Sequence, residues 1–397
     1  KENIAGIITE TGGTTSHSAI LARALEIPAV LSVEGVASSL KNGDTVVVDG
    51  SEGAVIVNPD DNTVAEYSKK RDAFLAERKE LENYRGRETK SASGEVYELF
   101  CNIGKPEDAV KAVDADGEGV GLFRTEFLFM DRTSIPTEDE QYEAYKKAAL
   151  ILKGKSLIIR TLDIGGDKDI PYLGLKKEEN PFMGFRAIRY CLKNRELFKS
   201  QIKAILRASA FGDIKIMFPL ITTMDELREG KKLVAECKAD LRNMGINFNE
   251  NIQVGVMVET ASAAVIADML AKEADFFSIG TNDLTGYTMA CDRGNNDVSY
   301  LYSPLQPSVL RMIKRTIECG VQNGISVGMC GEAAANKLMI PLLISFGLTE
   351  FSVSAPSVLN VRKIISTWTK EEADKVTAKV LEMITQQEIV EYLKSVV

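Results

Sequence analysis

The chain has 397 residues, of which 45% are apolar and 26% are charged, and these proportions are typical of a soluble globular protein with a large core. A formal net charge of −9 argues against a nucleic-acid-binding surface. The longest apolar run, at 339–348, contains Pro341 and Gly347 and is too short to cross a bilayer, so we expect no membrane insertion.

The six cysteines occur singly, without a C-x-x-C pair, and His17 is the one histidine of the chain. These counts argue against a zinc cage and against disulfide cross-links, and free thiols are typical of proteins in a reducing cytoplasm. The chain begins with Lys1 and Glu2 and continues at once into a strand-like segment. We therefore expect no secretory signal, and a fragment that starts within its first domain.

The first 59 residues contain short apolar runs typical of β-strands and one segment with helical spacing. Residues 60–85 are highly charged, with sparse apolar side chains at helical spacing, and a loop follows. We predict a small β/α domain at 1–59, incomplete at its N-terminus, and a helical linker at 60–93. The strand-like runs are IAGIIT at 4–9, TVVVDG at 45–50 and GAVIVN at 53–58, and the helical segment is SHSAILARALE at 16–26.

From residue 96 to about residue 368, short apolar strands alternate with long helical segments. Eight alternations predict a closed parallel (β/α)8 barrel, and the unbroken apolar character of the strands is typical of parallel strands covered by helices. A charged helical tail closes the chain, so the predicted barrel domain with its tail covers 94–397. The predicted strands are VYELFCN at 96–102, GVGLFRT at 119–125, SLIIRTL at 156–162, IKIMFPL at 214–220, QVGVMVE at 253–259, DFFSIGTND at 275–283, SVGMCGE at 326–332 and EFSVSA at 350–355.

Polar or ionisable residues stand where most of these strands end. Barrel enzymes assemble their active sites at the carboxyl ends of several strands at once, so we expect the functional site at this end of the barrel. The strand-end candidates are Asn102, Arg124, Arg160, Glu259, Asn282, Asp283 and Cys330.

His17 stands at the start of the predicted helix at 16–26, directly after the sequence GGTTS. Glycines allow a ligand to approach the backbone, Thr15 and Ser16 can cap the helix, and a helix N-terminus favours a phosphate group. A neutral imidazole in this place is a competent nucleophile toward phosphorus. The alternative is a capped surface helix with an incidental histidine.

Four arginines follow barrel strands, namely Arg124, Arg160, Arg186 and Arg293. A guanidinium group binds phosphate or carboxylate through two parallel hydrogen bonds, so four of them at one mouth of a barrel indicate a small polyanionic ligand. Lys168, after a Gly-Gly turn, can add a further charge beside a phosphate. Each arginine taken alone could instead form a surface salt bridge.

Glu259 and Asp283 follow neighbouring predicted strands, which brings two carboxylates close enough to share a hard cation such as Mg²⁺. The alternatives are a rim salt bridge for Glu259 and a helix cap for Asp283. Cys330 follows another strand between small residues, where its thiol could deliver a proton to a substrate carbon. The alternative for Cys330 is buried packing, the role we expect for the other five cysteines.

Seven segments carry these candidates in consistent order: GGTTSHSAILAR, GVGLFRTEFLFMDR, RTLDIGGDKD, NPFMGFRAIR, VMVETASAA, FFSIGTNDLTGYTMACDRGN and GMCGEAAA. From residue 4 to beyond residue 360, the chain resembles the Enzyme I family of the bacterial sugar phosphotransferase system, the phosphoenolpyruvate–protein phosphotransferases. The resemblance implies a swivelling phosphohistidine domain joined to a phosphoenolpyruvate-binding (β/α)8 barrel. It also implies a cytoplasmic homodimer formed through the barrel domain, and a requirement for Mg²⁺.

The resemblance implies a role for each candidate residue. His17 is the implied phosphorylated histidine, and Cys330 is the implied acid that protonates the enolate to give pyruvate. Glu259 and Asp283 are the implied magnesium ligands. The implied clamp on phosphoenolpyruvate consists of Arg124, Arg160, Lys168, Arg186, Asn282, Asp283 and Arg293.

The implied reaction moves the phosphoryl group of phosphoenolpyruvate to His17, for onward transfer to the phosphocarrier protein HPr. The chain departs from the family at Gly286 and Ala261. Members carry a helical HPr-binding domain upstream, which the resemblance leads us to expect is missing from this chain. One alternative is a fragment of pyruvate phosphate dikinase or phosphoenolpyruvate synthase, which an upstream ATP-grasp domain would favour. Another is a non-catalytic module that senses phosphoenolpyruvate, against which the complete set of candidate catalytic groups argues.

Overall fold

The structure of the chain is a computed structural model, and it forms two compact units, residues 1–83 and residues 84–397. Within the described part of the chain, no helix combines the length and the apolar character needed to cross a bilayer. The structure describes all residues except 1–3, 12–21, 23–26, 131 and 166–169.

The N-terminal unit contains two separate pairs of short strands. β1 (Ile7–Ile8) pairs in parallel with β2 (Ala29–Val30), and β3 (Val46–Asp49) pairs in antiparallel with β4 (Ala54–Val57). The three predicted strand segments are thus confirmed. The sequence pattern does not reveal β2 or the one-turn helix α2 (Val36–Ser39), because such short elements show no hydrophobic period.

The predicted helix at 16–26 falls almost entirely outside the described residues. Only Ala22 of this segment is described, and it is helical and buried. His17, the central residue of the sequence-based hypothesis, is therefore outside the described residues, and its role stays a prediction.

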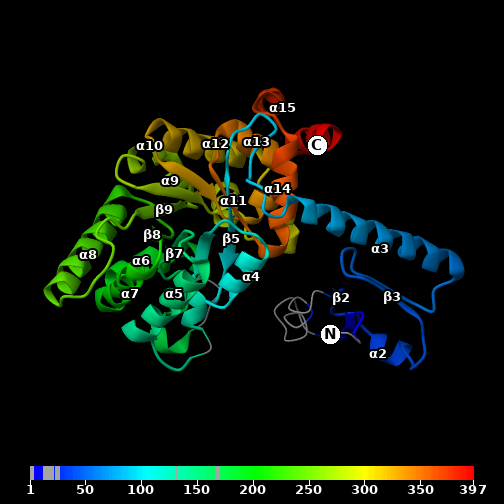
Figure 1. The fold of residues 1–397 in the computed structure, drawn as a ribbon, viewed down its shortest axis with the longest axis horizontal. Coiled ribbons are helices and arrows are strands. Elements are labelled where there is room, and N and C mark those ends of the chain that lie inside the picture. Colours follow the sequence, from blue (N-terminus) through cyan, green and yellow to red (C-terminus); the bar gives the residue numbers. More distant parts are fainter. Residues whose placement is uncertain (1–3, 12–21, 23–26, 131, 166–169) are drawn as a thin grey trace. The chain divides into compact units, whose positions relative to one another are not determined.

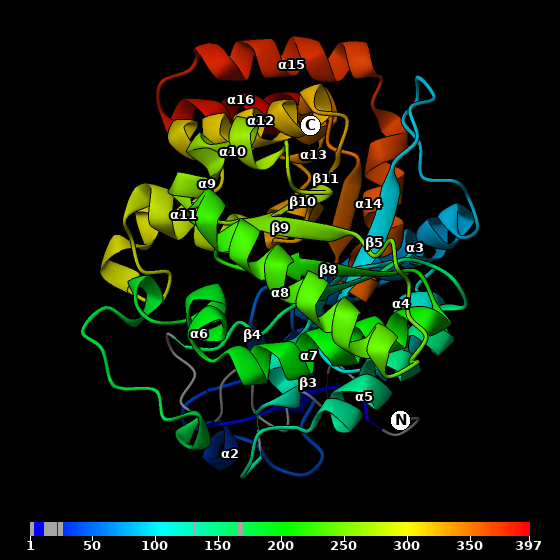
Figure 2. The same cartoon turned by 90° about the vertical axis from the view of Figure 1, so that its left-hand side faces the viewer.

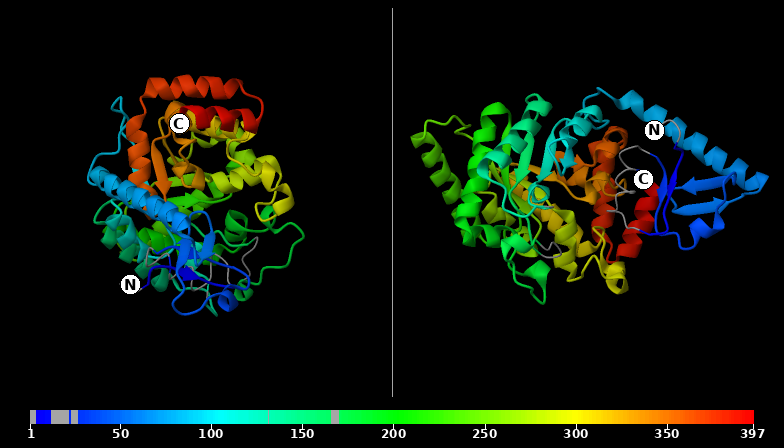
Figure 3. Two further views of the ribbon diagram at one scale, coloured as in Figure 1. Left: turned by 90° about the vertical axis from the view of Figure 1, so that its right-hand side faces the viewer. Right: turned by 90° about the horizontal axis from the view of Figure 1, so that it is seen from below.

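α3 (Asp61–Leu81) and the short 3-10 helix η1 (Glu82–Tyr84) account for the predicted helical linker. α3 starts at Asp60, whose side chain caps the helix, and none of its residues is buried. Its Lys70 pairs with Glu52 in the turn between β3 and β4 (3.5 Å). Figure 3 shows one continuous helix beside these two strands. The charged sequence thus forms a helix without a buried residue, as its sparse apolar pattern predicts.

The C-terminal unit is the predicted parallel barrel. Its strands are hydrogen-bonded in the closed order β10-β11-β12-β5-β6-β7-β8-β9, and every neighbouring pair is parallel. Helices surround the strands on the outside (Figure 1), which explains why the strands are apolar on both faces. The strands are β5 (Glu98–Ile103), β6 (Val120–Arg124), β7 (Leu157–Arg160), β8 (Ile214–Phe218), β9 (Val254–Val258), β10 (Phe276–Ile279), β11 (Ser326–Met329) and β12 (Glu350–Val353).

The predicted helical tail consists of two helices, α15 (Lys370–Glu382) and α16 (Gln386–Val396). The break lies at Thr385, whose side chain and the N3 residue Glu388 make a capping box at the start of the second helix. Figure 2 shows the two tail helices, α15 and α16, lying over α12. The helices of this unit are α4 (Asp108–Asp114), α5 (Glu138–Leu152), α6 (Ala187–Lys193), α7 (Arg195–Ala208), α8 (Met224–Asn243), α9 (Ala261–Val265), α10 (Ala267–Leu270), α11 (Thr281–Met289), α12 (Pro307–Gln322), α13 (Ile340–Phe346), α14 (Val358–Thr367), α15 (Lys370–Glu382) and α16 (Gln386–Val396).

Arg362 of α14 ties the segment that follows η1 to the barrel. Its side chain is only 2% exposed. It donates hydrogen bonds to the Tyr84 carbonyl (3.1 Å), the Thr89 hydroxyl (3.0 Å) and the Asp116 carbonyl (2.8 Å), and it pairs with the carboxylates of Asp116 and Glu118. One buried guanidinium group therefore satisfies hydrogen-bond acceptors at Tyr84, at Thr89 and at 116–118. It thereby holds the segment before β5 against the barrel.

We expect Arg362→Met to destabilise the barrel by about 3 kcal/mol or more, because breaking a buried ion pair leaves the partner carboxylates without an opposite charge. Arg242→Met is the matched control, since Arg242 pairs with Glu250 at an exposed site, and it should cost less than about 1 kcal/mol. Urea unfolding followed by circular dichroism measures both. Equal losses in the two variants would contradict a structural role for the Arg362 network.

Candidate active site

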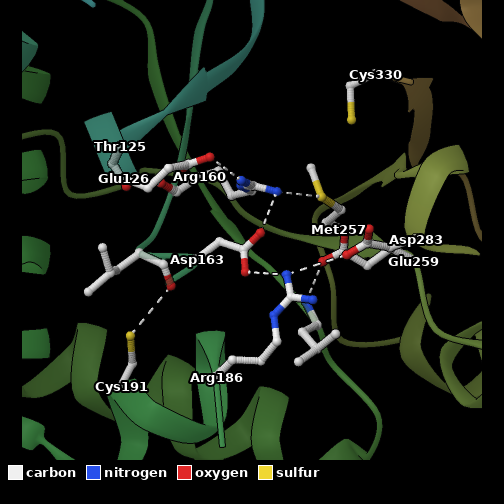
Figure 4. A network of polar contacts seen from close by, with 12 residues as sticks. Thr125, Glu126, Arg160, Asp163, Arg186, Cys191, Met257, Glu259, Asp283 and Cys330 are labelled. Carbon is white, nitrogen blue, oxygen red and sulfur yellow. Dashed lines mark hydrogen bonds and ion pairs between the residues drawn. The ribbon is translucent and has the colours of Figure 1, made fainter. Parts of the chain in front are cut away.

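Four of the predicted site residues come together at the carboxyl end of the barrel (Figure 4). Arg160 is the last residue of β7, Glu259 directly follows β9, and Asp283 lies in the first turn of α11 after β10. Arg186 enters from the residue before α6. Figure 4 shows these side chains converging from separate elements on one polar site, as parallel barrel geometry predicts.

Asp163 joins the two arginines of this site. Its Oδ2 lies 2.9 Å from Arg160 Nη1, and its Oδ1 accepts a hydrogen bond of 2.7 Å from Arg186 Nη2. Arg186 Nη2 also lies 3.4 Å from Asp283 Oδ2. Burial opposes the charge of both guanidinium groups, but the carboxylate of Asp163 and its neighbours raise the pKa of Arg160 and of Arg186 above the ordinary value. The two cations are therefore permanent and fixed in direction.

The arginines keep donors available beyond this network. Arg160 Nη2 donates to Glu126 Oε1 (2.9 Å), and its Nη1 lies 3.6 Å from the Met257 sulfur. Among the described residues, neither Arg160 Nε nor Arg186 Nε has a hydrogen-bond partner, although both atoms are buried. A buried N–H without a partner costs free energy, which a bound anion would recover. The site therefore suits an anionic ligand.

Glu259 is buried among other charged groups. Its Oε1 accepts a hydrogen bond of 2.7 Å from the Leu220 backbone N–H. Burial raises the pKa of Glu259 to about 8; the carboxylates of Asp283 and Asp163 add to this rise, and Arg160 and Arg186 oppose it. The two carboxylates that follow β9 and β10 therefore repel each other, which is the condition that a shared cation relieves.

The Glu259 and Asp283 carboxylates fit a magnesium ion as its protein ligands. Mg²⁺ takes one or two protein carboxylates and completes its shell with substrate oxygens and water. Within the described residues, no group of three or more His, Cys, Asp or Glu side chains is arranged to hold a metal. Gly280 leaves room beside Glu259, because a side chain there would meet Glu259 Oε2 at 2.8 Å. The pair thus suits an ion that binds together with an anionic ligand.

Cys330 directly follows β11 and lies beside the Met257 side of the site, as Figure 4 shows. It is 7% exposed. Burial raises the pKa of its thiol to about 12, although the Ser278 hydroxyl and Arg160 act in the opposite direction. Asn102 holds this strand end, because its Nδ2 donates to the Cys330 carbonyl (3.1 Å). The thiol is therefore protonated at neutral pH and able to act as an acid.

Two families of known proteins match the chain along its length. The family described as PEP-utilising enzyme, PEP-binding domain, matches residues 78–369, and the family described as PEP-utilising enzyme, mobile domain, matches residues 1–53. The chain belongs to the PEP-utilising enzymes. The boundary between the two matches falls within the first 83 residues, which form the N-terminal unit.

Two curated relatives of this PEP-utilising enzyme carry the same name. The chain is 50% identical over 394 residues to the phosphoenolpyruvate-protein phosphotransferase of Bacillus subtilis (strain 168), which covers 99% of this chain and 69% of that protein. It is 48% identical over 394 residues to the protein of that name from Staphylococcus carnosus (strain TM300), with the same coverage. A citrate lyase structure from Burkholderia xenovorans LB400 is also similar (TM-score 0.43, 12% identity, 78% of this chain and 92% of that chain), a likeness too weak to carry an argument.

Three predicted binding residues of the PEP-utilising enzyme take no part in the hydrogen bonds and ion pairs of the buried network described above. Arg124 is exposed and its guanidinium stands 5.3 Å from the centre of the Phe127 ring. Arg293 is exposed in the segment after α11. The Asn282 carbonyl accepts a hydrogen bond of 2.9 Å from the Tyr302 hydroxyl. Lys168, like His17, lies outside the described residues, so the roles of these five residues stay predictions.

The sequence pattern does not single out the acidic partners of the arginines. Asp163 and Glu126 lie inside the segments RTLDIGGDKD and RTEFLFMDR but two or three residues beyond the strand ends, so they are not strand-terminal residues. Tyr287 is also unpredicted, and its hydroxyl receives a hydrogen bond of 3.2 Å from Arg186 Nη1. A rule that buried arginines need acidic partners would have pointed to Asp163 and Glu126.

Proposed function

We propose that this chain transfers the phosphoryl group of phosphoenolpyruvate to His17 and releases pyruvate, as in a phosphoenolpyruvate–protein phosphotransferase. The main support is the pair of buried arginines at the barrel mouth, Arg160 and Arg186, which Asp163 joins. The chain is also 50% identical to a protein of that name. Phosphoenolpyruvate presents a phosphate and a carboxylate close together. Two fixed guanidinium groups beside two carboxylates that we propose as Mg²⁺ ligands suit this ligand.

The substrate-binding groups act by charge and position. Arg160 and Arg186 bind the anionic oxygens, and Arg124, Arg293, Lys168 and Asn282 join them from the rim of the site. Glu259 and Asp283 would hold Mg²⁺, which as a Lewis acid offsets the negative charge of the phosphate and of the leaving enolate. Because phosphoryl transfer needs little covalent assistance, this preorganised charge accounts for most of the expected catalysis.

His17 is the nucleophile in this proposal. Its imidazole nitrogen forms the new bond to phosphorus as the bond between phosphorus and the enol oxygen breaks, so that pyruvate enolate leaves. Cys330 then gives its thiol proton to the methylene carbon of the enolate, which yields pyruvate and a thiolate. The raised pKa of the Cys330 thiol supports this role, because the proton is present when the enolate forms.

Onward transfer to the phosphocarrier protein HPr in sugar uptake belongs to the same proposal, as do a homodimer formed through the barrel unit and a place in the cytoplasm. We also propose three parts of the chain: a phosphohistidine domain at 1–59, a helical linker at 60–93 and the barrel domain at 94–397. The reaction requires such a division, because His17 lies in the first domain and must reach the mouth of the barrel. The names of the curated relatives favour this function over a dikinase or synthase fragment and over a sensing module.

The test is phosphorylation with phosphoenolpyruvate and Mg²⁺. We expect one acid-labile phosphate per chain and one pyruvate released with it, and none in His17→Ala, because no other imidazole exists in the chain. Ser38→Ala, on α2 of the same unit, is the matched control and should retain full uptake. Stoichiometric phosphate on His17→Ala would refute the assignment of His17, and pyruvate release absent from the unsubstituted protein would refute the function.

A further inference from the structure

Tyr287 is a polar side chain of the site to which the proposed reaction gives no role. It lies on α11, four residues after Asp283, and residues four apart on a helix share a face. Arg186 Nη1 donates a hydrogen bond of 3.2 Å to the Tyr287 hydroxyl, and Arg186 Nη2 lies 3.4 Å from Asp283 Oδ2. α11 therefore presents two side chains to the same guanidinium group, one charged and one neutral.

The Tyr287 hydroxyl accepts a hydrogen bond from Arg186 while its own proton is used elsewhere. The hydroxyl donates to the Phe182 carbonyl, in the 3-10 helix η4 (Pro181–Met183). A tyrosine hydroxyl has one proton, and a guanidinium group has donors only. The bond to the Phe182 carbonyl thus fixes the rotation of the hydroxyl and directs an oxygen lone pair toward Arg186.

Arg186 is held at both of its terminal nitrogen atoms. Asp163 Oδ1 accepts a hydrogen bond from Nη2 at 2.7 Å, and the Tyr287 hydroxyl accepts one from Nη1 at 3.2 Å. A guanidinium group is planar, so two fixed nitrogen atoms define the plane of the whole group. The bond to Tyr287 therefore sets the direction of the Arg186 donors that are left for a ligand.

The same hydroxyl also holds the segment that leads to Arg186. The Arg186 guanidinium lies 5.7 Å from the centre of the Phe182 ring, so the two ends of this segment meet. The segment has a further support, because the Phe185 N–H donates to a Glu178 carboxylate oxygen at 3.0 Å. Loss of the Tyr287 hydroxyl should therefore change the orientation of Arg186 more than the fold of the segment.

We propose that Tyr287 is a positioning residue of the reaction, which orients the Arg186 guanidinium toward an anionic oxygen of the substrate. The inference rests on the proposed function. Tyr287 keeps its proton throughout and makes or breaks no covalent bond. Its contribution is the hydrogen bond to Arg186, directed by the bond to the Phe182 carbonyl.

Asp283 does not replace Tyr287 in this role. Asp283 contacts Nη2 of Arg186, the nitrogen that Asp163 already holds, and leaves Nη1 to Tyr287. In the proposed function Asp283 is also a Mg²⁺ ligand, and an oxygen bound to a cation attracts an arginine less strongly. The neutral hydroxyl of Tyr287 keeps its bond to Arg186 when Asp283 turns to the cation.

The test is a double-mutant cycle of Tyr287→Phe and Arg186→Met, measured by single-turnover release of pyruvate from phosphoenolpyruvate with Mg²⁺. Phenylalanine keeps the ring and removes only the hydroxyl. We expect Tyr287→Phe to lower kcat/KM roughly tenfold to a hundredfold. In the Arg186→Met background the same change should cost less than about threefold, because no guanidinium group is left to orient.

Tyr190→Phe is the matched control. The Tyr190 hydroxyl also donates to a backbone carbonyl, that of Leu173 at 3.2 Å, and no arginine bonds to it among the described residues. Both phenylalanine variants should lower the urea midpoint slightly and to a similar extent, whereas only Tyr287→Phe should lower kcat/KM. This comparison does not depend on the folding of Arg186→Met, which circular dichroism verifies.

Three results would contradict the positioning role of Tyr287. They are an unchanged kcat/KM in Tyr287→Phe, equal losses in Tyr287→Phe and Tyr190→Phe, and the same loss from Tyr287→Phe with and without Arg186. The last result would show that Tyr287 acts on the fold and not through Arg186. Absence of pyruvate release from the unsubstituted protein would instead refute the proposed function, and this inference with it.

Discussion

Asp163→Asn is expected to lower kcat/KM for phosphoenolpyruvate by roughly a hundredfold to ten-thousandfold. Asp163 gives one oxygen to Arg160 and the other to Arg186, at 2.9 and 2.7 Å. An asparagine of the same shape would turn an amide N–H toward one of the two guanidinium groups, donor against donor. The arginine concerned would then lose the direction that aims it at the substrate.

The same substitution should also destabilise the barrel, by about 3–5 kcal/mol, because it leaves two buried cations with less compensating charge. Single-turnover release of pyruvate and urea unfolding measure the two effects separately. Asp139→Asn is the matched control: Asp139 also binds an arginine, Arg207, but its side chain is 81% exposed, so the expected loss of stability is at most about 1 kcal/mol. Catalysis by Asp163→Asn within a few-fold of the unsubstituted protein would contradict the positioning role of Asp163.

The barrel could be predicted from the sequence because its strands are defined by local composition. β9, for example, is buried at all five positions. An unbroken apolar run of that length between helical segments is typical of a parallel strand covered by helices. The division of the tail into α15 and α16 was open to prediction too. Thr385 and Glu388 form the T-x-x-E pattern of a capping box, which marks the start of α16 within the helical tail.

The candidate site could be predicted only as far as strand ends define it. Arg160 and Glu259 are found by that rule because parallel strands deliver their carboxyl ends to one mouth of the barrel. Asp163 lies in the loop beyond β7, so the strand-end rule does not include it. Which loop carboxylate meets which arginine depends on the path of the loop in three dimensions, and the sequence pattern does not contain that path.

Glu259→Gln is expected to abolish the Mg²⁺ dependence of phosphoenolpyruvate binding and to lower kcat about a thousandfold or more. Glutamine can still accept the hydrogen bond from the Leu220 N–H, which Glu259 receives at 2.7 Å. The local backbone should therefore keep its course. What the variant loses is the negative charge that the cation requires, and with it one of the two protein ligands.

Stability should move in the opposite direction to activity in this variant. In the absence of Mg²⁺, Glu259 is a buried carboxyl group whose pKa is raised to about 8, so its ionisation near or above that pH opposes folding. The neutral amide removes this cost, and we expect Glu259→Gln to unfold at a higher urea concentration than the unsubstituted protein at alkaline pH. A residue needed only for the fold would lose stability and activity together.

Asp283→Asn is expected to have the same effect, because Asp283 is the second proposed ligand and lies on a different element, α11. Calorimetric titration with phosphoenolpyruvate, with and without Mg²⁺, should show that the cation strengthens binding to the unsubstituted protein and not to either variant. Glu273→Gln is the matched control, since Glu273 pairs with Arg228 at an exposed site, and it should retain the full effect of Mg²⁺. Undiminished Mg²⁺ dependence in both Glu259→Gln and Asp283→Asn would remove the metal from this pair of carboxylates and require another set of ligands.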